Sequence, residues 1–122
     1  MSKFVIRKVS SGVKFDLRAT NGQTVATSEV YKTLASCLRG IESVRKSAPV
    51  AAMENCIDGE GEKKLNPKFE MYQDKANQYR FRLRARNGKI IAVSEPYTTR
   101  AACENGIDSV RKNADTAETV QE

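Results

Sequence analysis

The sequence predicts an α+β fold in which one small unit of antiparallel strands followed by a helix occurs twice in tandem. Two observations lead to this prediction. Residues 15–48 align with residues 81–114 without a gap and are identical at 20 of 34 positions. In both copies the spacing of apolar residues changes from the two-residue period of a strand to the longer period of a helix at the same point.

The strands of each copy precede its helix. A first strand is expected at about residues 3–9 and again at 68–73, and the next two strands form a hairpin. The hairpin turns are Asn21-Gly22 and Asn87-Gly88, because Asn-Gly favours a type I′ turn with positive φ at both central residues. This turn predicts a register in which the facing pairs are Thr20 and Gln23, Arg18 and Val25, Asp16 and Thr27, and Lys14 and Glu29, then Arg86 and Lys89, Arg84 and Ile91, Arg82 and Val93, and Arg80 and Glu95. The other face carries the expected core residues Phe15, Leu17, Ala19, Phe81, Leu83 and Ala85.

The helices follow at equivalent positions. Thr33 and Thr99 are suitable N-caps, and small or apolar residues then recur at helical spacing at Cys37, Gly40, Ile41, Val44, Cys103, Gly106, Ile107 and Val110. A mid-helix glycine costs about 1 kcal/mol relative to alanine, so we expect a close approach of the helix backbone to the sheet. Leu34 and Leu38, where the second copy has Arg100 and Glu104, are expected to be covered by the linker or by a second chain.

One copy alone is too small to bury a sufficient core. We therefore predict a single domain over residues 1–122, with repeat 1 at 1–57, a polar, glycine-rich linker at 58–66 and repeat 2 at 67–122. Composition is that of a globular protein, with 39% hydrophobic and 30% charged residues. No apolar stretch is as long as a membrane span, and the N-terminus lacks the apolar core of a signal peptide, so we expect a cytoplasmic protein.

Catalytic chemistry has little support in the sequence. The absence of histidine from the chain excludes histidine-based triads and most zinc sites. The acidic run Asp58, Glu60 and Glu62 departs from the twelve-residue calcium loop. Cys37 and Cys103 lie on the apolar helix face, where burial raises a thiol pKa, and the more accessible Cys56 has no second thiol nearby. We therefore predict no catalytic residue, cofactor or metal, and a monomeric, non-enzymatic interaction module with an unknown protein partner.

An alternative function rests on a row of basic residues. Strand alternation places them together on the face opposite the core: Arg80, Arg82, Arg84 and Arg86, with Lys89 beside them. Guanidinium groups in a row suit phosphates, which indicates weak, sequence-independent binding of nucleic acid or another polyanion. Tyr79 lies on the wrong face to add base stacking. The simpler interpretation is a solvated face on which arginine stems cover Ile91 and Val93.

The sequence also resembles a known family. The segments that carry the resemblance are Phe69–Tyr72, Tyr79–Gly88, Ser94–Tyr97 and Ala101–Ala114, and they resemble the YegP-like family, a bacterial family of tandem domains of unknown function. The resemblance implies β-β-β-α-β repeats that form one continuous, mostly antiparallel sheet with two helices on one face. It also implies that the last strands, Val50–Ile57 and Thr116–Gln121, are exchanged between the repeats. It implies no catalytic residue.

Overall fold

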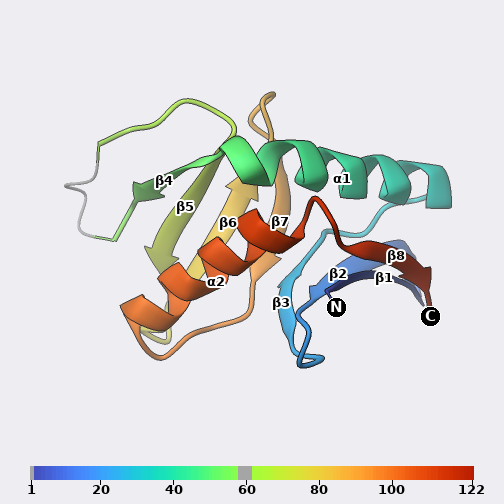
Figure 1. The fold of residues 1–122 in the computed structure, drawn as a ribbon, viewed down its shortest axis with the longest axis horizontal. Coiled ribbons are helices and arrows are strands. Elements are labelled where there is room, and N and C mark those ends of the chain that lie inside the picture. Colours follow the sequence, from blue (N-terminus) through green and yellow to red (C-terminus); the bar gives the residue numbers. More distant parts are fainter. Residues whose placement is uncertain (1, 58–61) are drawn as a thin grey trace.

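The computed structural model describes residues 2–57 and 62–122 (Figure 1). Four residues of the predicted linker, among them Asp58 and Glu60, lie outside the described residues. The first repeat contains β1 (Lys3–Val9), β2 (Gly12–Arg18), β3 (Thr24–Thr27), α1 (Leu34–Ser47), the short 3₁₀ helix η1 (Ala48–Val50) and β4 (Ala52–Asn55). The second contains β5 (Lys68–Gln73), β6 (Tyr79–Arg84), β7 (Ile90–Ser94), α2 (Arg100–Asn113) and β8 (Glu118–Gln121). No helix of this described part is both long and apolar enough to cross a membrane.

All of these strands belong to one mixed sheet, in the order β4-β5-β6-β7-β3-β2-β1-β8. The two repeats meet at its centre, where β3 pairs with β7. The last strand of each repeat pairs with the first strand of the other, β4 with β5 and β8 with β1, and these two pairings are the parallel ones. The exchange is confirmed, although both exchanged strands are shorter than expected.

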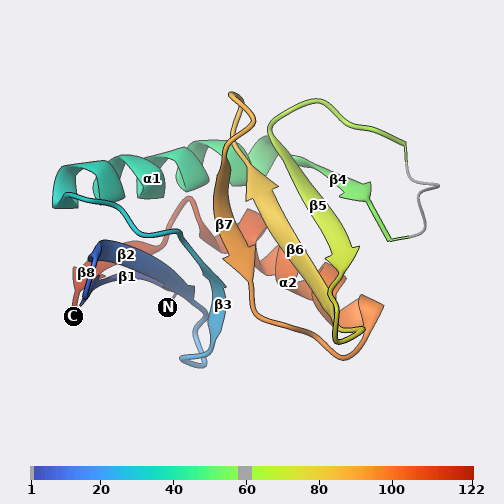
Figure 2. The same ribbon diagram turned by 180° about the vertical axis from the view of Figure 1, so that it is seen from behind.

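Both helices pack on the same face of the sheet, as the resemblance implied. Figure 1 shows α2 in front of β5, β6 and β7, and Figure 2 shows these strands in front of α2. The side chains between the sheet and the helices form one hydrophobic core that includes Phe4, Phe15, Ile41, Phe69, Phe81 and Ile107. Thr33 and Thr99 cap the helices, each with its hydroxyl oxygen accepting a backbone N–H at 3.1 Å. Each repeat therefore supplies half of a shared core.

The mid-helix glycines make room for a tyrosine ring. A Cβ atom at Gly40 would collide with the hydroxyl end of Tyr31, and one at Gly106 would collide with Tyr97. Tyr31 in turn stacks on Phe15, with ring centroids 6.3 Å apart. The expected close approach is thus real, but a ring lies between the helix backbone and the sheet.

The type I′ turn prediction is wrong in both hairpins. Gly22 has a φ of 85° and its N–H donates to the Ala19 carbonyl at 2.9 Å, while among the described non-glycine residues Asn77 is the one with positive φ. The Ala19 N–H donates to the Gln23 carbonyl at 2.9 Å, so the loop has three residues and ends in a glycine bulge. The sequence Asn-Gly is compatible with both turns, since each needs positive φ at the glycine.

The longer loop shifts the register near each turn, and a second irregularity restores it. Arg18 faces Thr24 instead of Val25, whereas Asp16 faces Thr27 as predicted. In the second repeat Arg84 faces Ile90 instead of Ile91, and Arg82 faces Val93 as predicted. Because of these shifts Val25 and Ile91 belong to the core, so Ile91 does not lie beneath the arginine stems.

Leu34 and Leu38 are each 41% exposed. The described ends of the linker lie near β4, at the opposite end of α1 from these leucines (Figure 1). Covering by the linker, as far as it is described, is therefore wrong. Covering by a second chain stays a prediction.

Candidate functional site

The predicted arginine row lies on the face of the sheet that the helices leave open, here called the outer face. Arg82 and Arg84 both donate through Nε to Oε1 of Glu70, at 2.7 and 2.6 Å. Lys68 approaches Oε2 of the same carboxylate at 3.5 Å. Glu70 is only 7% exposed, so its negative charge is buried among three cations of the protein itself.

This pairing follows from the register between β5 and β6. Glu70 faces Arg82, Lys68 faces Arg84 and Tyr72 faces Arg80, so their side chains share the outer face. The Arg82 guanidinium also lies over the Tyr72 ring, 4.7 Å from its centroid. Neither Glu70 nor Tyr72 was predicted as a neighbour of the arginines, because the hairpin pattern identifies β7 as a partner of β6 but carries no signal for the strand on its other side.

Arg80 has a different acidic partner from the one predicted. Its Nε donates to Oδ2 of Asp74 at 2.8 Å, and Nη1 donates to the Ser94 carbonyl at 3.2 Å. The hydrogen bond from Arg80 lowers the pKa of Asp74. The predicted neighbour Glu95 is exposed and lies beyond the end of β7, so the proposed pairing of Arg80 with Glu95 is wrong.

A second carboxylate extends this network to the edge strand. Glu54 on β4 accepts from Lys68 Nζ at 2.8 Å and from the backbone N–H of Lys64 at 2.7 Å. These two bonds lower the pKa of Glu54 to about 2. Burial by itself raises the pKa of Glu70, but the hydrogen bonds from Arg82 and Arg84 outweigh it and lower that pKa. Both carboxyl groups are therefore ionised at neutral pH.

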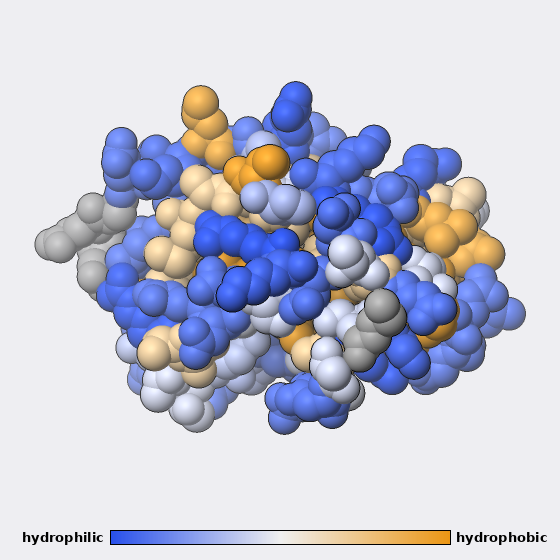
Figure 3. Space-filling model, in the orientation of Figure 1, coloured by the Kyte–Doolittle hydropathy of each residue, from blue (hydrophilic) through white to orange (hydrophobic). Residues whose placement is uncertain are grey.

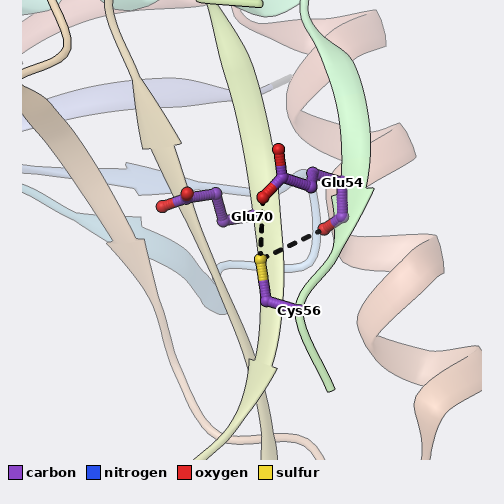
Figure 4. Close-up of side chains that lie close together, drawn as sticks. All are labelled: Glu54, Cys56 and Glu70. Atoms are coloured by element: carbon purple, nitrogen blue, oxygen red, sulfur yellow. Dashed lines mark hydrogen bonds between the residues drawn. The ribbon is translucent and has the colours of Figure 1, made fainter. Parts of the chain in front are cut away.

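Cys56 lies beside this network (Figure 4). Its thiol donates to Oε2 of Glu54 at 3.2 Å and lies 3.9 Å from the Glu54 carbonyl. Burial and the Glu54 carboxylate raise the pKa of Cys56 to about 11. Cys37 and Cys103 are fully buried as predicted, and burial raises the pKa of each. The thiols are therefore protonated at neutral pH, which makes them weak nucleophiles.

Glu54, Cys56 and Glu70 bring three possible metal-ligand atoms within 4.8 Å of one another. Lys68, Arg82 and Arg84 already occupy their carboxylate oxygens. A metal ion would have to displace these cations and deprotonate the thiol. The geometry therefore fits an internal ion-pair network better than a metal centre.

Arg86 and Lys89 do not join the outer-face network. They are exposed on the β6–β7 turn, which reaches α1 (Figure 2). Together with α1 this turn bounds a surface hollow, here called the α1 groove, whose lining includes Arg39, Ser43, Lys46, Arg86, Asn87 and Lys89. Arg39 and Lys46 were not predicted as site residues. The sequence does contain one indication of Arg39, since the second copy has Asn105 at that position.

Comparisons with known proteins agree with the fold. A family model described as a domain of unknown function (DUF1508) matches residues 10–55 and 74–121, one segment in each repeat. A UPF0339 protein of Treponema denticola is 57% identical over 54 residues, which are 44% of this chain and 93% of that protein. The UPF0339 protein YegP of Yersinia pestis is 36% identical over 114 residues, which are 93% of this chain and 88% of that protein. The solution NMR structure of yegP from E. coli, a protein of unknown function, superposes with a TM-score of 0.79 at 30% identity and covers 99% of this chain and 92% of that chain.

Proposed function

The chain belongs to the UPF0339 family and matches the DUF1508 domain of unknown function in both repeats, and we propose that it is a non-enzymatic interaction module. One observation carries this proposal. On the outer face Glu54 and Glu70 are paired with Lys68, Arg82 and Arg84, and no group of this network is poised for chemistry. The comparisons name no activity that points to catalysis.

Acid–base and nucleophilic catalysis both need groups in a reactive protonation state. An efficient general acid or base has a pKa near the working pH, whereas ion pairs lower the pKa of Glu54 and Glu70. A cysteine nucleophile reacts as the thiolate, whereas the pKa of Cys56 is raised to about 11. The network stabilises the sheet and leaves these groups inert near pH 7.

The proposed module acts as a monomer and contacts its partner through its surface. The exchanged strands β4 and β8 pair within one chain and form the two edges of the sheet, so the strand exchange needs no second copy. In the view of Figure 3 the apolar side chains form small groups separated by polar ones, unlike the large apolar interfaces of obligate dimers. The three free cysteines fit a reducing, cytoplasmic setting.

Thiol reactivity tests the non-enzymatic part of this proposal. A pKa of about 11 instead of 9.0 lowers the thiolate fraction of Cys56 at pH 7 about 100-fold. Native protein treated with iodoacetamide should therefore label slowly, with Cys56 ahead of Cys37 and Cys103, and urea-unfolded protein is the control. Native labelling of any cysteine as fast as in urea would contradict the proposal.

Capture from native lysate tests the interaction part. Tagged protein, with and without nuclease treatment of the lysate, should retain a partner above the level of a tag-only control. Retention that survives nuclease indicates a protein partner, and retention that nuclease abolishes indicates a nucleic acid. Retention equal to the tag-only control under both conditions would contradict the interaction module.

A further inference from the structure

We infer that the α1 groove binds the phosphate backbone of single-stranded nucleic acid. This inference rests on the proposed interaction module and names its ligand. It moves the predicted binding surface away from the outer face. Of the five basic residues in the original prediction it keeps only Arg86 and Lys89.

The groove is a continuous surface feature built from both repeats. Two adjoining hollows of about 430 Å³ each share Ser43, Ala85 and Asn87 in their linings. On the α1 side, residues at intervals of three or four positions form one stripe along the helix, namely Ser36, Arg39, Gly40, Ser43, Lys46 and Ser47. Arg39 and Lys46 are seven residues apart, which corresponds to about 10 Å along the helix axis. The groove is therefore long enough for consecutive phosphates of one strand.

Four cations line this groove without an acidic partner. Arg39, Lys46, Arg86 and Lys89 are all exposed, and none forms an ion pair with any described residue. Glu29 supplies the single carboxylate of the lining. The contrast with Arg80, Arg82 and Arg84 is direct, since each of those has a carboxylate within 2.8 Å.

The other half of the molecule shows that the fold does not need these cations. The counterparts of Arg39, Lys46, Arg86 and Lys89 are Asn105, Lys112, Thr20 and Gln23. Glu95 corresponds to Glu29. The groove therefore has four basic side chains and one acidic one, a net charge of +3, whereas the equivalent positions have one basic and one acidic side chain, a net charge of 0. Because the same backbone accepts neutral residues at three of the four positions, the concentration of charge points to a ligand.

The donors favour phosphate, and the shape favours a single strand. Arginine and lysine stand beside Ser36, Ser43 and Asn87, and these residue types make most protein contacts to nucleic-acid backbones. The groove is open to solvent along its length, which suits a chain better than a small enclosed anion, and it is concave, which suits a thin strand better than a duplex. Tyr31, the one aromatic residue in the described lining, is half-buried, stacks on Phe15 and lies with its hydroxyl end against Gly40, so it is a poor platform for base stacking. Binding should therefore be weak and independent of sequence.

The repeat supplies its own test variants. In R39N/R86T/K89Q each residue takes the identity of its counterpart, so the local backbone should be preserved. Labelled single-stranded DNA and RNA of about 15 nucleotides are titrated by fluorescence anisotropy at about 50 and 150 mM salt. We expect wild-type binding that weakens with salt, and a variant whose slope of log affinity against log salt is smaller by about 2, at about 0.7 per lost phosphate contact.

Two further variants control for net charge. K3Q/K8Q/K75Q removes three exposed lysines that line neither part of the groove and should bind almost as well as wild type. The reverse exchange, T20R/Q23K/N105R, creates a second basic groove beside Lys112 and should add a second binding site on longer oligonucleotides. Circular dichroism confirms that each variant is folded.

Several outcomes would overturn the inference. Equal loss in the groove variant and the lysine control would indicate non-specific attraction, and tighter binding of polyglutamate would indicate an acidic protein segment. Tighter binding of duplex than of single strands would reject the proposed shape match. No binding to any oligonucleotide at 50 mM salt would show that nucleic acid is not the ligand. The proposed interaction module would still stand, because the lysate capture tests it separately.

Discussion

The outer faces of the two repeats balance their charges in different ways. Among β1, β2 and β3 of the first repeat the buried acid is Asp16 on β2, which pairs with Arg7 at 2.9 Å and approaches Arg18 at 3.8 Å. Asp16 aligns with Arg82 of the second repeat, where the buried acid is instead Glu70 on β5. The buried acid thus lies on the second strand of the first repeat and on the first strand of the second repeat. In both places an arginine nitrogen lies within 2.9 Å of its carboxylate.

The edge strands differ in the same region. At one edge of the sheet Val5 of β1 faces Val120 of β8. At the equivalent place of the other edge Glu70 of β5 faces Glu54 of β4, with Lys68 between the two carboxylates. An apolar pair and a charged triad thus occupy equivalent sites. What both repeats require is local charge balance on the outer face, so the arginine row belongs to the structure of the sheet.

The largest predicted effect concerns the dependence of each repeat on the other. Residues 1–60 and 66–122, produced separately, should not give folded monomers, because each piece keeps the last strand that pairs with the other and loses half of the core. Amide dispersion in NMR spectra is the measurement, with the full chain as control. Two well-dispersed monomers would show that the repeats are independent.

Removal of the second-repeat acid should have the next largest effect. E70Q leaves Arg82, Arg84 and Lys68 without their shared carboxylate and should lower the free energy of unfolding by about 2–3 kcal/mol, less than for a fully buried pair because the arginines are partly exposed. Urea denaturation measures the change. The variant E70V/Y72R/R82D copies the arrangement of the first repeat and should be more stable than E70Q. If it is less stable, the two charge arrangements are not equivalent.

The mid-helix glycines should respond alike in both repeats. G40A and G106A each place a methyl group against a tyrosine hydroxyl, and overpacking should cost about 1–3 kcal/mol, offset by about 1 kcal/mol of helix propensity. Thermal unfolding gives the comparison. Y31F/G40A removes the colliding hydroxyl and should recover part of the loss. Stabilisation by G40A alone would mean that Tyr31 moves aside freely.

The smallest predicted effect is a pH dependence specific to the β4–β5 edge of the sheet. The hydrogen bonds from Lys68 and Lys64 lower the pKa of Glu54 in the folded state to about 2, from its ordinary value of 4.5. Its stabilisation is therefore complete above about pH 4.5 and is lost as the pH falls toward 2. We expect about 1 kcal/mol after solvent screening. Urea titrations from pH 6 to pH 2.5 should show a shallower decline for E54Q than for wild type, and V120T, at the counterpart position, should keep the wild-type slope.

Self-alignment of the sequence determined the repeat, and local patterns determined the first three strands and the helix of each repeat, the core face at Phe15 and Phe81, and the N-caps Thr33 and Thr99. These elements depend on residues a few positions apart, because alternation, helical spacing and capping are local properties. The turn type was beyond these patterns, since Asn-Gly serves two kinds of hairpin loop. The exchange of the last strands came from the family resemblance, because a four-residue strand carries no signal for its neighbour.

The candidate sites depend on contacts between segments that are distant in sequence. The sequence predicted that Arg80, Arg82, Arg84 and Arg86 share a face, but β6 ends at Arg84, and the pairing of β5 with β6 decided that Glu70 neutralises Arg82 and Arg84. The packing of α1 against the turn of the other repeat likewise decided that Arg39 and Lys46 lie with Arg86 and Lys89. The charge that a side chain presents to a ligand depends on its neighbours in space, and only the tertiary structure brings those neighbours together.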